Sequence, residues 1–178
     1  NFFNRTMTFA HKYFDGRVPS AGSRDDQDNQ HLQRCKQAAD KTATELEACH
    51  FKAALAEVMA LARAGNLYFD ATKPFMGRKT DMDACGRAIN VCLQTCRTLA
   101  TLVAPFLPHI AEKCAVMLKL GRDWQQWSAA REELPDGHPL GPAPITSEPP
   151  RSETYDSNRP QSPSGASLGG TSPRMITS

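Results

Sequence analysis

Apolar positions recur with a helical period over most of the first 134 residues, at intervals of three and four. The period predicts helices at about 1–14, 30–48, 50–74, 81–103 and 110–120. Alternation of the kind that marks β-strands is nearly absent. The pattern therefore predicts an all-α fold, an antiparallel bundle of about five helices.

Prolines and a capping residue set the limits of the two helices that dominate this pattern. Pro74 ends the third predicted helix, because proline lacks the amide hydrogen and disfavours helical geometry at the residue before it. Asp81 is a good cap for the next helix, which Pro105 and Pro108 terminate. Apolar residues surround that helix, of about 22 residues, so we expect it to be the central and most buried one.

The C-terminal region has a different composition. Nine of the thirteen prolines lie from Pro135 onward, and from about Pro142 the chain is rich in Pro, Ser, Gly and Thr. Such a segment buries too little apolar surface to offset the entropy lost on ordering. We predict a helical domain at 1–141 and a disordered tail at 142–178.

Charge and cysteine usage narrow the class of protein. The net charge of +2 does not predict a nucleic-acid binder by bulk electrostatics, so any such binding has to be local. No apolar run approaches eighteen residues, so no membrane span and no membrane partner are expected. The six cysteines form no C-x-x-C pair, which favours buried thiols in a reducing compartment over a metal site.

Signatures of catalysis are missing from the chain. It has neither a G-x-x-x-x-G-K-[ST] phosphate loop nor a G-x-G-x-x-G turn, and its five histidines are scattered. No catalytic residue, cofactor site or metal ligand is predicted. The first ten residues lack a signal-peptide pattern and an initiator Met and begin inside a helical pattern, which indicates a fragment.

The stretch 65–75, G-N-L-Y-F-D-A-T-K-P-F, places an aromatic ring directly after the helix-ending proline. The Phe75 ring at this corner is either part of the core or a platform for stacking. The basic turn that follows contains Arg78 and Lys79, which are candidate phosphate contacts. An ordinary solvated turn explains the same pair and is the interpretation favoured by the residues alone.

Five motifs occur in an order that resembles a known family. N-F-F-N-R and F-D-G lie near the start, followed by N-L-Y-F-D-A-T-K-P-F and L-V-A-P-F-L-P-H-I-A-E-K, with L-P-D-G-H-P-L-G closing the set. Together they are similar to the anticodon-binding domain of methionyl-tRNA synthetase. The resemblance covers about residues 1–140. Single motifs also occur in sister class I synthetases, so the order and spacing carry the resemblance.

This resemblance implies binding of a methionine-accepting tRNA through its CAU anticodon. The family's Asn and Arg that read the leading cytosine match Asn1 and Arg5, and its stacking tryptophan, which follows a proline, matches Phe75 after Pro74. Phenylalanine keeps an aromatic face but has less area, so we expect weaker but retained stacking. Without an RNA role, Asn1 would cap a helix and Arg5 would pair with a carboxylate.

The family's catalytic signatures do not occur here, so the resemblance implies a non-catalytic part of an enzyme. The missing N-terminal catalytic domain would attach methionine to tRNA with ATP and magnesium, with zinc left open. A cytoplasmic location and no DNA partner are expected. Two rivals remain: the anticodon domain of a leucine, valine or isoleucine enzyme, against which Asn1 and Arg5 argue, and a helical protein-interaction module without an RNA role.

Overall fold

The computed structural model describes residues 2–77 and 80–142, and nothing is inferred about the structure of the other residues. Within these ranges the chain forms five helices of ten or more residues and two short ones, with no strand. The elements are α1 (Phe2–Tyr13), α2 (Asp26–Glu47), α3 (Phe51–Thr72), α4 (Pro74–Gly77), α5 (Met82–Val103), α6 (Pro108–Met117) and the 3₁₀ helix η1 (Trp127–Arg131). The predicted all-α bundle is confirmed.

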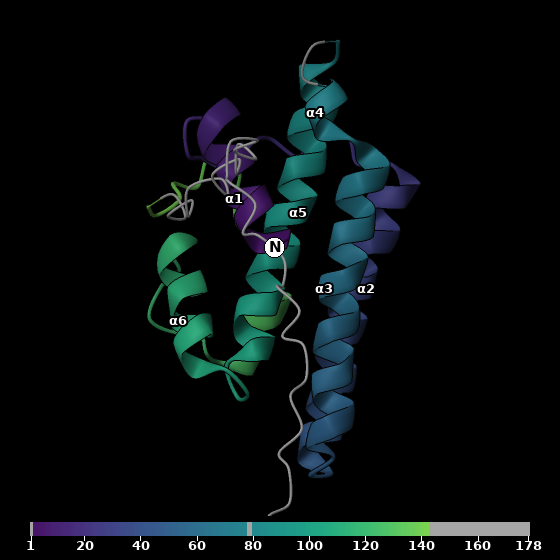
Figure 1. The fold of residues 1–178 in the computed structure, drawn as a ribbon, viewed down its shortest axis with the longest axis vertical. Helices are drawn as coiled ribbons and strands as arrows, with labels where there is room; N and C mark the ends of the chain where they lie inside the picture. The colour runs from purple at the N-terminus through teal and green to yellow at the C-terminus, as the bar shows by residue number, and fades with distance from the viewer. Residues whose placement is uncertain (1, 78–79, 143–178) are drawn as a thin grey trace, which may run out of the picture. The chain divides into compact units, whose positions relative to one another are not determined.

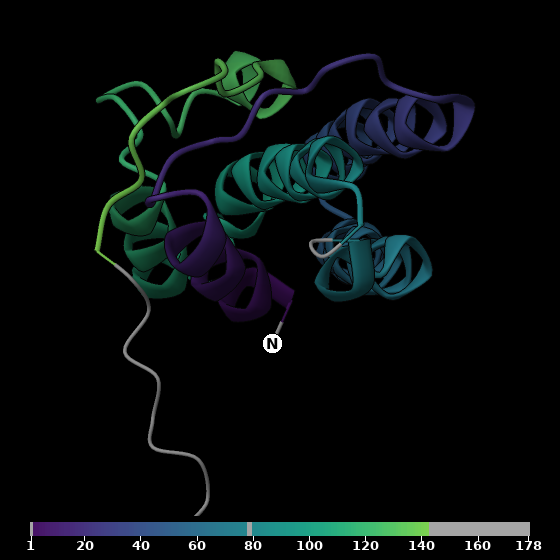
Figure 2. The same ribbon diagram turned by 90° about the horizontal axis from the view of Figure 1, so that it is seen from above.

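Helix α5 lies at the centre of the bundle and contacts every other helix (Figures 1 and 2). Asp81 caps it by accepting a hydrogen bond from the Ala84 amide at 2.9 Å. Its 22 residues match the predicted length, and Ile89, Val91 and Leu93 are fully buried. The core therefore forms around the helix that the sequence marked as most apolar.

The start of α2 differs from the prediction. This helix begins at Asp26 and not near residue 30, because Asp25 and Asp28 form a capping box. Asp25 accepts from the Asp28 amide at 2.9 Å, and Asp28 accepts from the Asp25 amide at 3.1 Å. Residues 25–29, which precede the predicted helix at 30–48, are thus the cap and first turn of a helix.

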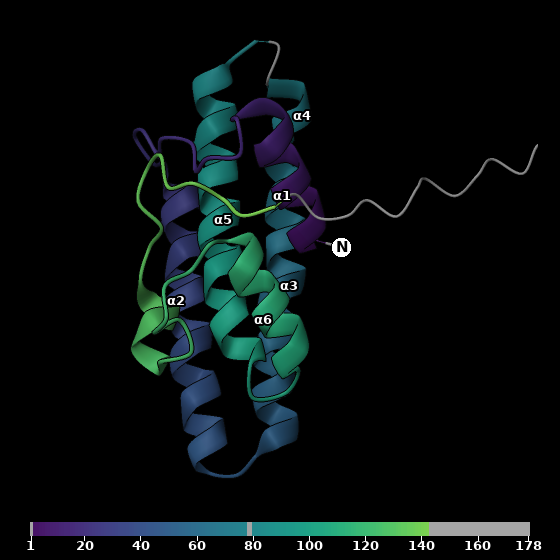
Figure 3. The same cartoon turned by 90° about the vertical axis from the view of Figure 1, so that its left-hand side faces the viewer.

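Helices α2 and α3 form a long antiparallel pair, with α4 at the far end of α3 (Figures 1 and 3). Helix α1 packs against α3 and α5. The buried Phe2 ring lies where Gly65 has no side chain, and a Cβ there would come within 2.7 Å of the ring. The absence of a side chain at Gly65 lets α1 approach α3 this closely.

The L-P-D-G-H-P-L-G segment lies beside the segment that follows α1. Val18 donates its amide hydrogen to the His138 carbonyl at 2.9 Å, and Leu140 donates to the Gly16 carbonyl at 2.8 Å. The Asp136 carboxylate accepts from the Ser20 hydroxyl at 3.0 Å. All described residues belong to one compact unit, bounded at Asn1–Ile145, and the predicted tail lies outside them from residue 143.

Four of the six free cysteines are buried, at 35, 85, 92 and 96. Cys49 is exposed and Cys114 half-buried, so the expectation of buried thiols is wrong for these two. Burial raises the pKa of Cys35 to about 11, which keeps it a thiol at neutral pH.

None of the helices within 2–77 and 80–142 combines the length and apolar content that crossing a membrane requires.

His31 joins α2 to α5 in the buried interior. Its Nε2 lies 3.0 Å from the Thr95 hydroxyl oxygen, and that hydroxyl donates its single proton to the Val91 carbonyl at 2.9 Å. The Thr95 oxygen is therefore the acceptor, and His31 Nε2 carries a proton. The imidazole also stacks on the Tyr68 ring, with centroids 4.6 Å apart.

Acid should destabilise this fold through His31. Burial, followed by the charge of Arg34, lowers the pKa of His31 from 6.5 to about 4. Between these pH values the unfolded chain binds more protons than the folded chain, so the free energy of unfolding falls as pH falls. We expect this group to remove about 2 kcal/mol between pH 7 and pH 5, measured by urea denaturation.

The control for this prediction is His31→Gln, whose side chain does not titrate. Its free energy of unfolding should depend less steeply on pH than that of the parent chain between pH 7 and pH 5. If the two pH curves run parallel, His31 does not carry this dependence.

Candidate functional site

The predicted corner at Pro74 is built by two changes of backbone direction. Lys73 adopts the left-handed conformation, with φ of 44° and ψ of 54°, and ends α3. Pro74 then begins the one-turn helix α4, and its carbonyl accepts a hydrogen bond from the Cys85 thiol at 3.3 Å. Pro74 is buried, whereas the Phe75 side chain is 46% exposed. The corner therefore presents the ring of Phe75 outward, and the core alternative for it does not hold.

A hollow of about 430 Å³ lies beside this ring, between α1, the end of α3 and α4. Its lining contains two cationic, two polar and four aromatic side chains, and no carboxylate: Asn4, Arg5, Thr8, Phe9, Lys12, Tyr13, Phe69 and Phe75. We call it the α1–α3 hollow. A cationic and aromatic lining is what single-stranded nucleic acid requires, since it combines phosphate attraction with stacking surfaces.

Two contacts hold Arg5 in the α1–α3 hollow. Its Nη2 donates to Asp70 Oδ1 at 2.7 Å, and its guanidinium carbon lies 4.4 Å from the centre of the Phe69 ring. The Arg5 and Asp70 side chains are 35% and 59% exposed. Arg5 thus forms an ion pair with a carboxylate, as expected for a role without RNA. It also lines the hollow that Phe75 lines.

Three aromatic side chains form a continuous series along one wall of the hollow. The Phe9 and Tyr13 centroids are 4.6 Å apart, and the Phe9 and Phe69 centroids are 6.3 Å apart in an edge-to-face arrangement. We call Phe69, Phe9 and Tyr13 the ring row. Phe9 and Phe69 are buried, so packing fixes the row before any ligand arrives.

A buried polar network holds the end of α3 that carries Phe69 and Asp70. The Tyr68 hydroxyl donates to Asp28 Oδ1 at 2.5 Å, and Arg87 Nε donates to Asp28 Oδ2 at 2.8 Å. The Asp28 residue is only 2% exposed. Burial first, and then the hydrogen bond to Asp28, raises the pKa of Tyr68, so its hydroxyl remains a donor.

The structure brings together two of the predicted site residues, Arg5 and Phe75, which line the same hollow. Pro74 is buried beneath the corner and does not line the hollow, so it shapes the site without facing it. Asn1, Arg78 and Lys79 lie outside the described residues. Their predicted roles remain predictions.

Sequence reasoning did not single out Phe69, Asp70, Lys12 and Tyr13 as site residues. Phe69 and Asp70 stand inside the motif before Pro74, and that position was the available signal. Their contacts to α1 join residues more than sixty positions apart. No local pattern predicts such contacts.

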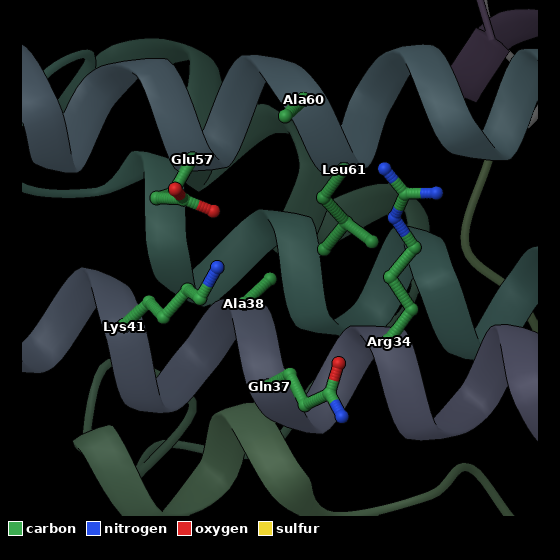
Figure 4. A pocket seen from close by; sticks show the side chains of 7 residues that line it. All are labelled: Arg34, Gln37, Ala38, Lys41, Glu57, Ala60 and Leu61. Atoms are coloured by element: carbon green, nitrogen blue, oxygen red, sulfur yellow. The ribbon is translucent and has the colours of Figure 1, made fainter.

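The groove between α2 and α3 differs in chemistry from the α1–α3 hollow. It holds about 310 Å³ and is lined by Arg34, Gln37, Ala38, Lys41, Glu57, Ala60 and Leu61. Figure 4 shows Arg34 and Lys41 extending from α2 toward α3, where Glu57 provides an opposite charge. No aromatic ring lines this groove, so it offers no stacking surface.

Among residues 2–77 and 80–142, no group of three His, Cys, Asp or Glu side chains is arranged to hold a metal ion.

Comparison with known proteins gives a consistent result. Residues 18–147 match the family described as the anticodon binding domain of methionyl tRNA ligase. The methionine–tRNA ligase of Thermococcus kodakarensis is 41% identical over 138 residues, which are 78% of this chain and 18% of that protein. That of Pyrococcus horikoshii is 39% identical over 145 residues, 82% of this chain and 20% of that protein.

A solved structure shares the fold. The free form of Mycobacterium tuberculosis methionyl-tRNA synthetase superposes with a TM-score of 0.77 at 24% identity, over 81% of this chain and 30% of that one. The chain spans about a fifth of the length of the two curated relatives. Helix α1, which carries Arg5, lies outside the range matched by the family.

Loss of charge at Asp70 and at Asp28 should have unequal effects on stability. Asp70→Asn weakens an exposed ion pair, so the free energy of unfolding should fall by less than about 1 kcal/mol. Asp28→Asn leaves Arg87 and Tyr68 without their charged acceptor in the interior, so the loss should be at least about 2 kcal/mol. Urea denaturation of both variants at pH 7 measures the difference, and equal losses would contradict it.

Proposed function

Because this chain belongs to the anticodon-binding domains of methionyl-tRNA ligases, we propose that its α1–α3 hollow binds the first base of a CAU anticodon. The observation that carries the proposal is that Arg5 and the outward ring of Phe75 line the same hollow. Anticodon loops are single-stranded RNA, which proteins recognise by splaying bases out and stacking them on aromatic rings.

The chemistry of Arg5 suits the proposed base. A guanidinium only donates hydrogen bonds, and cytosine offers acceptors on its pairing edge. Asn1 adds an amide oxygen that accepts from the exocyclic amine of cytosine; its part rests on the resemblance, since it lies outside the described residues. Arg78 and Lys79, also outside them, remain proposed phosphate contacts.

Phe75 supplies the stacking surface in this proposal. Its ring is 46% exposed at a corner that Lys73 and Pro74 fix, so little conformational freedom is lost when a base stacks on it. Base stacking on an aromatic side chain is worth about 1–3 kcal/mol by alanine substitution. Among the described residues, the proposed site thus combines one hydrogen-bonding group, Arg5, with one stacking platform, Phe75.

The function of the whole protein is a further part of the proposal. The chain spans about a fifth of its curated relatives, which are named methionine–tRNA ligases. We propose that methionine is attached to tRNA, with ATP and magnesium, by a catalytic part outside this chain. Whether that part binds zinc is left open. A cytoplasmic location belongs to the same proposal. No observation favours a sister synthetase or an interaction module without an RNA role.

Base discrimination tests the proposal directly. The 178-residue chain is titrated, at one fixed salt concentration, with anticodon stem-loops carrying CAU or a changed first base. The chain should prefer the CAU loop by about 1–3 kcal/mol, the discrimination expected from one good bidentate contact. Arg5→Ala should abolish the preference, and Arg122→Ala, at an exposed arginine outside the hollow, should keep it. Equal affinity of the parent chain for both loops would reject base recognition here.

A second prediction concerns stacking at Phe75. Phe75→Ala should weaken binding of the CAU loop by about 1–3 kcal/mol through loss of the platform. Phe51, which is 61% exposed at the opposite end of α3, provides the matched control. Phe51→Ala should leave the affinity unchanged, and equal losses in the two variants would argue against stacking on Phe75.

A further inference from the structure

The α1–α3 hollow extends past Arg5 along α1 to Lys12 and Tyr13. Arg5 and Lys12 are seven residues apart, which is close to two helical turns and about 10 Å of helix. Their side chains therefore leave α1 on the same side. The volume of about 430 Å³ lies within the range of ligand pockets, about 300–1,000 Å³.

The ring row connects the two ends of this hollow. Phe69 lies under the Arg5 guanidinium, Phe9 packs edge-on against Phe69, and Tyr13 follows with its centroid 4.6 Å from that of Phe9. Tyr13 is half-buried, so part of its ring faces the hollow that it lines. The row therefore runs from buried rings to the half-buried ring of Tyr13.

Lys12 is an exposed cation at the Tyr13 end. Its ammonium nitrogen lies 5.5 Å from the centre of the Tyr13 ring. Across the part of the chain that the structure describes, no carboxylate forms an ion pair with it, in contrast to Arg5 and its partner Asp70. A cation beside an aromatic face, with no acidic side chain in the lining, is suited to a phosphate next to a stacked base.

We propose that Lys12 and Tyr13 form a second nucleotide subsite, which takes the RNA nucleotide next to the one at Arg5. Tyr13 stacks on the base of that nucleotide, and the Lys12 ammonium contacts its phosphate. This inference rests on the proposed function, since it requires that single-stranded RNA occupies the α1–α3 hollow. It assigns the second nucleotide no hydrogen-bonded base recognition.

The phosphate contact is tested through the salt dependence of binding. Each phosphate contact to single-stranded nucleic acid adds about 0.7 to the slope of log affinity against log salt concentration. With the CAU stem-loop, Lys12→Gln should make this slope shallower by about 0.7. Lys52→Gln, at an exposed lysine at the opposite end of α3 from the corner, should leave it unchanged.

The outcomes separate this inference from the proposed function. If the parent chain prefers the CAU loop but Lys12→Gln leaves the slope unchanged, or both lysine variants change it equally, the subsite is overturned alone. If the parent chain shows no preference for the first base, base recognition at Arg5 fails. The change in salt dependence caused by Lys12→Gln still reports whether RNA lies along α1.

Stacking on Tyr13 is tested with stem-loops that lack a base immediately before or after the first anticodon position. Tyr13→Leu should weaken binding of the intact loop by at least about fivefold, the lower limit for one stacked base. With one of the two abasic loops the same substitution should have almost no effect, because that loop lacks the base on which Tyr13 is proposed to stack. Equal losses with all three loops would overturn the stacking role and would indicate a packing defect.

Discussion

The carboxylate of Asp28 joins the three long helices at the end of the bundle where the corner lies. It accepts hydrogen bonds from Tyr68 of α3, from Arg87 of α5 and from the backbone at the start of its own helix. A buried carboxylate is stable only while such partners neutralise and solvate it, so the three helix ends are constrained together. Tyr68 directly precedes Phe69 and Asp70. The position of both residues that contact Arg5 therefore depends on this interaction.

Arg5 is held in place by two contacts of the free protein, an exposed ion pair and a ring contact. Its ion pair with Asp70 is exposed, and exposed pairs contribute about 0–1 kcal/mol to stability. Its guanidinium carbon also lies 4.4 Å from the centre of the Phe69 ring. The free protein thus keeps the donor oriented without binding it strongly. Such an arrangement lowers the entropic cost of recognition while leaving the hydrogen bonds to the base as the main gain.

The sequence predicted the helices well where the apolar periodicity agrees with the capping and helix-ending residues. Helix α5, between Asp81 and the prolines that follow it, is the example. It failed at the start of α2, because the Asp25–Asp28 capping box lies in a polar run that shows no apolar periodicity. For the site, resemblance supplied Arg5 and Phe75, and the structure brings them to one hollow. Asp70 was missed because its contact with Arg5 depends on how α1 packs against α3, and that packing joins residues far apart in the sequence.

Packing between α1 and α3 also bears on the local RNA site that we propose for a chain with a net charge of only +2. The family match begins at residue 18, so Arg5 and Lys12 stand on a helix outside it, whereas Phe69 and Phe75 lie within it. The two parts meet at Gly65, where the Phe2 ring occupies the space that any side chain would fill. The packing of α1 against α3 places the Arg5 guanidinium beside the Phe69 ring, and the lining of the hollow contains no carboxylate. In the proposed function, affinity for RNA depends on the geometry of this one hollow more than on bulk charge.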